Sequence, residues 1–445
     1  MTSMHRRCVL ALGLLGVCAT GLAHTGDATL FQNVRIYDGR GASLSAPSQV
    51  LVRDDRIERI STAPIAPPPD AKLIDGQGHT LMPGLIDNHW HTMFAAPPLA
   101  QILQGDLGYL TLIAAAEARA TLLRGFTSVR DLGGPSFALK RAIDEGVVAG
   151  PRIYPSGAMI TITGGHGDFR APHELPRQMG GPPPIGGVLN ASQLADSPDE
   201  VRLRVREQLM LGASQIKLTA GGGVASPHSP LDVSTFTEDE LRAAVQAAGN
   251  WGTYVGVHAY TPQAIERAIA AGVKVIEHGH LMDDASARLI ADNGIWLSFQ
   301  PFVDDGFAPQ MPPSSMARLR QIFAGTEHAV ALAKKYKLKL AWGTDVLFSA
   351  ANATRQGALL VQMGKWFTPA EVLAMATGAG GELLALSGPR NPYPGKLGVV
   401  EEGALADLLL VDGNPLQDLN LVATPDQSFV LIMKGGVIFK NQLAR

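Results

Sequence analysis

The sequence predicts an α/β protein: a (β/α)8 TIM barrel with a small discontinuous β-sandwich domain formed by both chain ends. Three observations predict this fold. Both ends of the chain alternate apolar and polar residues as strands do, and eight short apolar segments in the middle alternate with helical patterns. In addition, several of those segments end in histidine, lysine or aspartate, as strands do at the mouth of an enzymatic barrel.

The chain has 445 residues, of which 46% are hydrophobic and 17% charged, and its formal net charge is -3. This length suits one large barrel with an accessory domain. The composition indicates a globular protein with a sizeable core. Because Lys and Arg are not in excess, we expect no nucleic-acid partner.

Residues 1–23 are expected to be a signal peptide. Arg6 and Arg7 precede a short apolar run, and Gly21–Ala23 offers a small-x-small cleavage site. The run is shorter than the roughly 20 residues that cross a bilayer, so we expect no stable membrane insertion after cleavage. A twin-arginine signal and lipid attachment at Cys18 are alternatives. Both cysteines lie in this segment, which excludes disulfides and thiol catalysis from the mature chain. The expected location is periplasmic or secreted.

Both ends of the mature chain, residues 24–82 and 387–445, are expected to form the β-sandwich domain. LFQNVRIYDG and VLVRDDRIERI alternate as strands, and the second turns at Asp54–Asp55. Near the other end, FVLIMKGGVIFK turns at Gly435–Gly436. Two β-rich ends around a long middle predict one domain closed by both termini.

Residues 83–386 are expected to form the barrel. Its helices include one after Thr237 that begins with a Thr237/Glu240 capping box and stops at Gly252. The Pro/Gly-rich segment 164–187 is too irregular for a helix, and we expect a loop over the barrel mouth. The eight predicted strands are Gly84–Ile86, Thr127–Asp131, Arg152–Met159, Gln215–Leu218, Tyr254–His258, Val273–His278, Trp296–Gln300 and Leu340–Gly343.

Candidate metal ligands follow these strands. PGLIDNHWHT places His89 and His91 two residues apart, so both side chains of an extended strand share one face. Such a pair alone is a weak signal, since many histidines are structural. The same position at other strand ends is taken by Lys217, His258, His278 and Asp345. Six groups of this kind at one barrel mouth indicate a metal-dependent enzyme.

The sequence resembles the metal-dependent amidohydrolase superfamily in the motifs NVRIYDG, PGLIDNHWHT, IKLTAGGGV, VHAYTPQAIERAIAAGV, IEHG, GTD and GKLGVVEEGALADLLLVDGNP. Within it, the chain looks most like the branch of Xaa-Pro and Xaa-Arg dipeptidase-like carboxypeptidases that includes ochratoxin-hydrolysing amidohydrolases. The resemblance covers nearly the whole mature chain.

The resemblance implies two divalent metal ions, expected to be Zn. His89, His91 and Asp345 would bind one ion, His258 and His278 the other, and Lys217 would bridge them as a carbamate formed with CO2. An unmodified Lys217 beside a single metal is the alternative, although an ammonium would repel two cations. Asp345 would act as general acid/base towards an activated water.

The resemblance also implies two substrate-binding residues. His166 would hydrogen-bond the substrate carbonyl or the oxyanion, and Tyr260 would meet the substrate α-carboxylate. A loop histidine that caps a turn and a packed tyrosine are the structural alternatives. His280 is expected to lie behind His278. Arg130 and Asp131 are expected to form a structural ion pair.

The function implied is hydrolysis of the amide bond of N-acyl amino acids or dipeptides, with ochratoxin A, cut to ochratoxin alpha and Phe, among the candidates. The same site could serve a cyclic-amide, lactone or ester hydrolase, and a non-catalytic barrel that binds small molecules is a remote alternative. The resemblance further implies a homo-oligomer. The expected partner is a small-molecule substrate.

Overall fold

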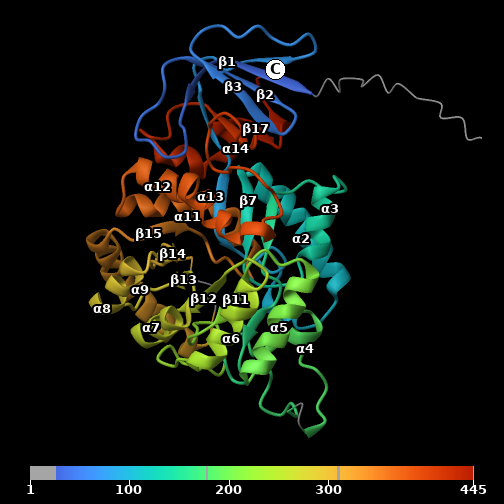
Figure 1. Ribbon diagram of the computed structural model, residues 1–445, viewed down its shortest axis with the longest axis vertical. Coiled ribbons are helices and arrows are strands. Elements are labelled where there is room, and N and C mark those ends of the chain that lie inside the picture. The colour runs from blue at the N-terminus through green and yellow to red at the C-terminus, as the bar shows by residue number, and fades with distance from the viewer. Residues whose placement is uncertain (1–26, 177–178, 308–310, 444–445) are drawn as a thin grey trace, which may run out of the picture.

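The computed structural model describes residues 27–176, 179–307 and 311–443, so the expected signal peptide lies outside the described residues. Figure 1 shows a β-sheet part above a larger part in which helices surround strands. No helix within the described ranges is long and apolar enough to cross a membrane.

The upper part is built by both ends of the chain, as predicted. The strands are β1 Ala28–Ile36, β2 Ser48–Arg53, β3 Arg56–Ser61, β4 Lys72–Asp75, β5 Thr80–Pro83, β16 Leu408–Val411, β17 Phe429–Lys434 and β18 Val437–Asn441. Their order is β18-β17-β16-β5-β1-β2-β3, with β4 paired to β1. A register shift after Phe31 lets the first half of β1 pair with β2 while its end pairs with β5. The predicted turns at Asp54–Asp55 and Gly435–Gly436 are confirmed, since each joins an antiparallel pair.

The larger part is the predicted (β/α)8 barrel. Its strands are β6 Leu85–Trp90, β7 Phe126–Asp131, β8 Arg152–Pro155, β9 Met159–Thr161, β10 Ser192–Leu194, β11 Ile216–Thr219, β12 Val255–Ala259, β13 Val275–His278, β14 Trp296–Phe299 and β15 Lys339–Trp342. They pair in parallel in the orders β6-β7-β8 and β10-β9-β11-β12-β13-β14-β15. The first and last strands meet where Asp345 N donates to His89 O at 2.8 Å.

The prediction of one strand over Arg152–Met159 is wrong. The chain leaves β8 after Pro155, and Gly157, with φ 70°, turns it before β9 begins at Met159. The unpredicted strand β10 pairs with β9, which also contacts β11.

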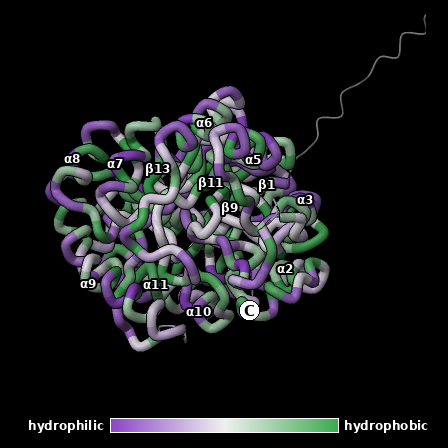
Figure 2. Tube along the Cα trace, turned by 90° about the horizontal axis from the view of Figure 1, so that it is seen from below, coloured by the Kyte–Doolittle hydropathy of each residue, from purple (hydrophilic) through white to green (hydrophobic). Residues whose placement is uncertain are grey.

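Helices surround the barrel strands on the outside, as Figure 2 shows from below. They are α1 Leu99–Ile102, α2 Leu107–Leu123, α3 Phe137–Asp144, α4 Ile185–Val188, α5 Pro198–Leu211, α6 Glu238–Gly249, α7 Pro262–Ala271, α8 Asp284–Asp292, α9 Pro313–Tyr336, α10 Ala350–Thr354, α11 Gln356–Gln362, α12 Pro369–Met375 and α13 Gly378–Leu384. A further helix, α14 Pro425–Ser428, lies against β17 in the β-sheet part. The short 3-10 helices are η2 Met363–Lys365, η3 Ala385–Arg390 and η4 Leu419–Ala423. The capping box of Thr237 and Glu240 is confirmed, but α6 ends at Gly249, three residues before the predicted stop.

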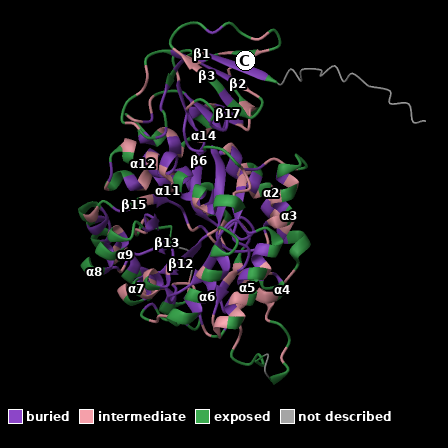
Figure 3. Ribbon diagram, in the orientation of Figure 1, coloured by how far each residue is buried: buried purple, intermediate pink, exposed green. Residues whose placement is uncertain are grey.

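The barrel strands lie in the interior, where Figure 3 shows them buried while the helices expose their outer faces. Every residue of β11, β12, β13 and β14 is buried. Polar side chains on these strands therefore cannot reach bulk water through the barrel wall. They must find partners inside the protein or face a cavity.

Candidate active site

A cavity of about 890 Å³ opens at the C-terminal ends of the barrel strands. Parallel strands of a barrel end at the same rim, so residues far apart in the chain meet there. The side chains predicted for the site all line this cavity: His89, His91, His166, Lys217, His258, Tyr260, His278 and Asp345.

His89, His91 and Asp345 form the tightest group. Asp345 Oδ1 lies 3.2 Å from His89 Nε2 and 3.2 Å from His91 Nε2. One ligand atom from each of the three residues lies within 4.8 Å of the other two. Both histidines are buried at the end of β6, and Asp345 follows β15 in a left-handed backbone conformation with φ 55°. The chain thus bends sharply to aim this carboxylate at the two imidazoles.

A buried carboxylate, that of Asp87, holds the segments that carry these three residues. It accepts hydrogen bonds from His89 N at 3.0 Å and from Thr344 N at 3.1 Å. The hydroxyl of Thr344 and the amide of Gln356 also donate to it, at 2.8 and 2.9 Å. Asp87 therefore fixes the spacing between the end of β6 and the loop after β15.

Lys217, His258 and His278 complete the inner wall. Lys217 Nζ lies 3.4 Å from His89 Nε2. The His278 ring stands 4.6 Å from the His258 ring and 4.9 Å from the His89 ring. The six residues predicted as metal ligands are therefore brought together.

Hydrogen bonds orient two of these imidazoles. His258 Nε2 lies 2.8 Å from Gly222 O, and His278 Nδ1 lies 2.7 Å from Gln300 Oε1. Carbonyl oxygens only accept, so these two ring nitrogens carry hydrogen. In a neutral ring, the lone pair then belongs to Nδ1 of His258 and to Nε2 of His278.

His89 is held by an ion pair beneath the cavity, and here the sequence-based prediction is wrong. Arg130 pairs with Glu277, at 2.7 Å to each carboxylate oxygen, and not with Asp131. Adjacent residues of a strand point to opposite faces, so Arg130 and Asp131 cannot meet. Asp131 accepts instead from Thr92 N and from a serine hydroxyl. Glu277 Oε2 lies 3.1 Å from His89 Nδ1 and directs His89 Nε2 to the cavity.

Burial controls the charge of the site. It lowers the pKa values of His91, His258 and His278, which therefore stay neutral. It also lowers the pKa of Lys217 to about 8. Burial alone would raise the pKa of Asp345, but the neighbouring histidines His89 and His91 hold it well below its usual range.

The donor set fits divalent metal ions. Zn²⁺ and similar cations bind carboxylates and neutral imidazoles. The imidazole typically binds the metal through one ring nitrogen while its other ring nitrogen donates a hydrogen bond to the protein. A family model described as "Amidohydrolase family" matches residues 80–438.

The chain belongs to the amidohydrolase family. It is 32% identical over 372 residues to an ochratoxinase from Aspergillus niger, covering 81% of this chain and 76% of that protein. The crystal structure of an amidohydrolase matches with a TM-score of 0.85 and 38% identity, covering 94% of this chain and 100% of the other. A prolidase complexed with N-methylphosphonate-L-proline matches with a TM-score of 0.85 and 34% identity, covering 93% and 100%. The protein is thus a hydrolase that acts on amide bonds.

His166 and Tyr260 flank the inner wall of this amidohydrolase. The ring of His166 lies 4.3 Å from that of His258, and burial lowers the pKa of His166 to about 4. Tyr260 stacks on His278 at 4.9 Å, and burial raises its pKa well above the usual value. Both side chains therefore stay neutral and can donate hydrogen bonds.

The outer cavity of the amidohydrolase is largely apolar. The described residues of segment 164–187 reach the mouth, as expected, since His166, Gly167, Phe169, Ile185 and Gly186 line the cavity. The expectation that the segment holds no helix is wrong at its end, where the short helix α4 begins at Ile185. The apolar lining includes Phe94, Leu99, Ile102, Phe169, Phe302, Phe348 and Leu359. A substrate with a large apolar group would bury it here.

Two other histidines lie behind or beside the site. His280 stacks on Phe299 at 4.5 Å and its Nε2 lies 2.9 Å from Gln300 O, so it packs behind His278. His228 Nε2 lies 2.7 Å from Arg170 O in the loop at the mouth. Neither residue lines the described part of the cavity.

Sequence reasoning missed four residues that shape the site: Asp87, Glu277, Gln300 and Arg318. The first three are buried beneath it and act through contacts to histidines or their backbone. Arg318 lines the cavity from α9. Asp87 and Glu277 lie next to predicted ligands in buried strands, which is a usable signal. Nothing in the local pattern distinguishes Arg318 from other helical arginines.

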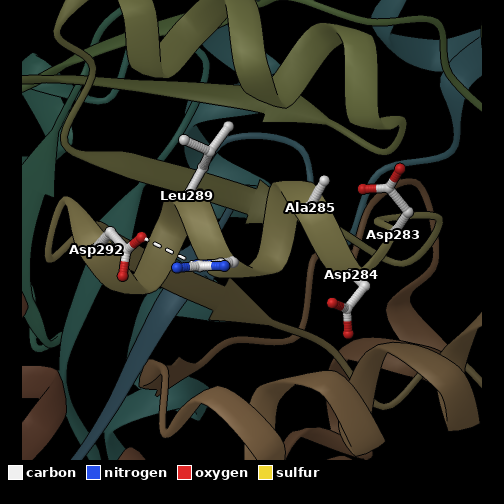
Figure 4. A pocket seen from close by; sticks show the side chains of 6 residues that line it. Asp283, Asp284, Ala285, Leu289 and Asp292 are labelled. Atoms are coloured by element: carbon white, nitrogen blue, oxygen red, sulfur yellow. Dashed lines mark ion pairs between the residues drawn. The ribbon is translucent and has the colours of Figure 1, made fainter.

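A second hollow lies on the outer side of α8, drawn in Figure 4. Its charges serve the local structure. Asp283 caps the helix, Asp284 accepts from the Tyr336 hydroxyl at 2.6 Å, and Arg288 pairs with Asp292 at 3.5 Å. The described residues that line this hollow include no histidine or lysine, unlike the cavity at the barrel mouth.

Proposed function

We propose that this amidohydrolase uses two divalent metal ions, zinc in the native enzyme, to hydrolyse the amide bond of N-acyl amino acids or dipeptides. The observation that carries the proposal is the convergence of six donor side chains in one cavity beside two neutral hydrogen-bond donors. His89, His91 and Asp345 would hold one ion. His258 and His278 would hold the other.

Lys217 would join the two metal positions as a carbamate. Its pKa of about 8, lowered by burial, leaves part of the amine neutral near neutral pH, and only the neutral amine reacts with CO2. The neutral nitrogen forms a bond to the carbon of CO2 and releases one proton, so a neutral amine becomes an anion. Starting from the ammonium form, two protons are released in all. That anion offers two oxygens where an ammonium would repel both metal ions.

When bound, divalent ions supply Lewis acidity that lowers the pKa of water and polarises a carbonyl group. The chain's own residues would handle protons and orientation. Asp345, an anion at neutral pH, would take the proton of the attacking water and pass it to the leaving nitrogen. His166 would donate to the carbonyl oxygen, where negative charge develops, and the Tyr260 hydroxyl to the substrate carboxylate.

The substrate class draws support from the relatives. One similar chain is an ochratoxinase, and another is a prolidase complexed with N-methylphosphonate-L-proline, an amino-acid derivative. The apolar outer cavity suits a bulky acyl group or side chain. N-acyl phenylalanines, ochratoxin A included, are therefore tested beside Xaa-Pro and Xaa-Arg dipeptides.

The test is release of the free amino acid by purified mature protein supplied with zinc and bicarbonate. The panel holds Xaa-Pro, Xaa-Arg and Xaa-Phe dipeptides, N-acyl phenylalanines, and a set of lactones, esters and cyclic amides. We expect turnover of substrates with an acylated amino acid, abolished by a chelator and restored by metal. Turnover confined to the lactones, esters or cyclic amides would contradict the substrate class.

The carbamate has its own test in Lys217→Ala. This variant should lose metal, measured by elemental analysis, and a short carboxylic acid such as acetate or propionate should restore both metal and activity. Lys217→Arg is the control, since it keeps a cation but cannot form a carbamate. Full metal content in either variant without added acid would contradict the bridging role.

We also propose that the protein is exported to the periplasm or beyond and assembles as a homo-oligomer. The export proposal rests on the sequence of residues 1–23. N-terminal sequencing of protein from cell fractions should find a chain that begins at His24, and light scattering should give a mass above that of one chain. A cytoplasmic, uncleaved monomer would contradict both proposals.

A further inference from the structure

Arg318 brings a positive charge to the cavity from outside the barrel strands. It lies on α9 and lines the cavity together with Ser315, three residues earlier. Ile322, four residues later, packs in one cluster with Tyr260 and Leu231. Residues three and four apart share one side of a helix, so Arg318 lies on the side of α9 that faces the cavity and Tyr260.

The guanidinium of Arg318 is anchored by backbone oxygens. Its Nη1 donates to Gly223 O at 2.9 Å, Ser226 O at 2.8 Å and Ser229 O at 3.0 Å. The loop that it binds also packs closely against His166. A Cβ atom added at Gly223 would lie only 2.1 Å from His166 Nδ1. These bonds hold Arg318 against the loop that contacts His166.

The charge of Arg318 is not neutralised by an acidic side chain. Among the described residues it forms no ion pair, and no hydrogen bond uses its Nη2. Carbonyl oxygens orient a guanidinium without cancelling its charge. Arg318 itself lines the cavity that holds the predicted metal ligands. The charge therefore acts within the site.

Arg355 offers a comparison within the same cavity. It pairs with Asp305 at 2.5 Å, and its guanidinium lies 3.7 Å over the ring of Phe307. The carboxylate of Asp305 therefore neutralises the charge of Arg355. Of the two arginines on the described cavity wall, Arg318 alone retains a charge that a ligand can neutralise.

We propose that Arg318 is the counter-charge for the free carboxylate of the substrate, and that it makes the enzyme select substrates with an unblocked C-terminal carboxyl group. The inference rests on the proposed function and deepens it. The guanidinium supplies the charge, while the neutral Tyr260 hydroxyl adds a hydrogen bond. A neutral C-terminal carboxamide would lose the ionic part of this interaction.

The experiment compares one substrate pair in three proteins. The pair is the N-acyl amino acid that the wild type cleaves fastest, such as N-acetyl-L-phenylalanine, and its C-terminal carboxamide. Release of the acyl acid is measured for both substrates with wild type, Arg318→Met and Arg318→Lys. For each protein, kcat/KM for the carboxylate substrate is divided by kcat/KM for the carboxamide substrate. We expect a wild-type ratio above about 10, a fall of about 10- to 100-fold in Arg318→Met, and a smaller fall in Arg318→Lys.

The ratio separates a binding role from a structural one. Loss of folded protein lowers both rates alike and leaves the ratio unchanged. Arg355→Met is the matched control, and it should change both rates by the same factor. If Arg318→Met fails to fold, the ratio in Arg318→Lys and wild-type inhibition by L-phenylalanine against L-phenylalaninamide decide the question.

Two results would overturn the inference. A wild-type ratio near 1, or a ratio that neither Arg318 variant changes, would remove the role of Arg318 and leave the amide hydrolase standing. Failure of the wild type to cleave either member of any pair would instead reject the proposed function, and the inference with it.

Discussion

The carboxylate of Asp345 lies 3.2 Å from both His89 Nε2 and His91 Nε2 and stays ionised. Asp345→Asn keeps the shape of the side chain but cannot take a proton. We predict that kcat falls by about 10²- to 10⁴-fold, the usual contribution of a general acid or base, while metal content is kept. Steady-state assays measure kcat, and elemental analysis measures the metal content of the variant. A kcat within tenfold of wild type would rule out the proton-transfer role.

Glu277 and Arg130 form an ion pair in which both side chains are fully buried. Glu277→Gln leaves the Arg130 charge without a counter-ion in the barrel interior. We predict a loss of about 3–5 kcal/mol in the free energy of unfolding, measured with urea. The double variant Arg130→Met/Glu277→Leu removes both charges and should be less destabilised than the single one. Equal or greater loss in the double variant would contradict this account.

The residues of the site differ in how far the sequence alone predicts them. His258 and His278 end apolar runs, so a strand and its rim position can be predicted from neighbouring residues. The partner of Glu277 is 147 residues away in the chain, and only the barrel brings the two together. Arg318 lies within a helix whose facing side depends on tertiary packing. Local patterns therefore predict metal ligands better than the residues that orient them or bind substrate.

At the scale of elements, seven of the eight predicted strands are confirmed, because each is a short apolar run between helical patterns. The division into β8 and β9 was missed, although Pro155, Ser156 and Gly157, which separate the two strands, are typical turn residues. What separates the two strands is the positive φ of Gly157 and the hydrogen bond from Ala158 N to the amide oxygen of Gln208, at 2.9 Å. The glycine is visible in the local sequence, whereas the contact with Gln208 of α5 is not.

Closure of the barrel depends on the approach of β15 to β6. A Cβ at Gly343 would lie 2.4 Å from His89 N and 2.5 Å from His89 Cβ, so any side chain there pushes the two segments apart. We predict that Gly343→Ala lowers the free energy of unfolding by about 1–3 kcal/mol, as overpacking does, and weakens metal retention. Thermal unfolding and elemental analysis measure both effects.

Gly249→Ala is the control for this substitution. Gly249 ends α6, and a Cβ there meets no atom within 4 Å. Alanine in a helix should therefore be neutral or stabilising by up to about 1 kcal/mol. Equal stability of the Gly343 and Gly249 variants would show that the two strands can separate without cost.

At the scale of the whole molecule, the β-sheet part and the barrel are joined by partly buried polar contacts. Arg152 of β8 binds Asp407, just before β16, through two hydrogen bonds of 3.0 and 3.1 Å. Lys434 of β17 donates to Gly150 O at 2.6 Å, at the start of the same barrel segment. The sequence predicts a domain built from both termini, but these contacts between distant residues require the folded chain.

Lys434 makes this junction sensitive to pH. Burial lowers its pKa from 10.5 to about 8, against an opposing effect of Asp407. Between these two values the unfolded chain holds a proton that the folded chain has lost, so the free energy of unfolding rises with pH. Lys434→Met lacks this titration. We predict that wild type gains about 1–3 kcal/mol relative to the variant between pH 8 and pH 10.5, measured by urea unfolding at several pH values. A difference that stays constant over this range would mean that the amine remains charged at the junction.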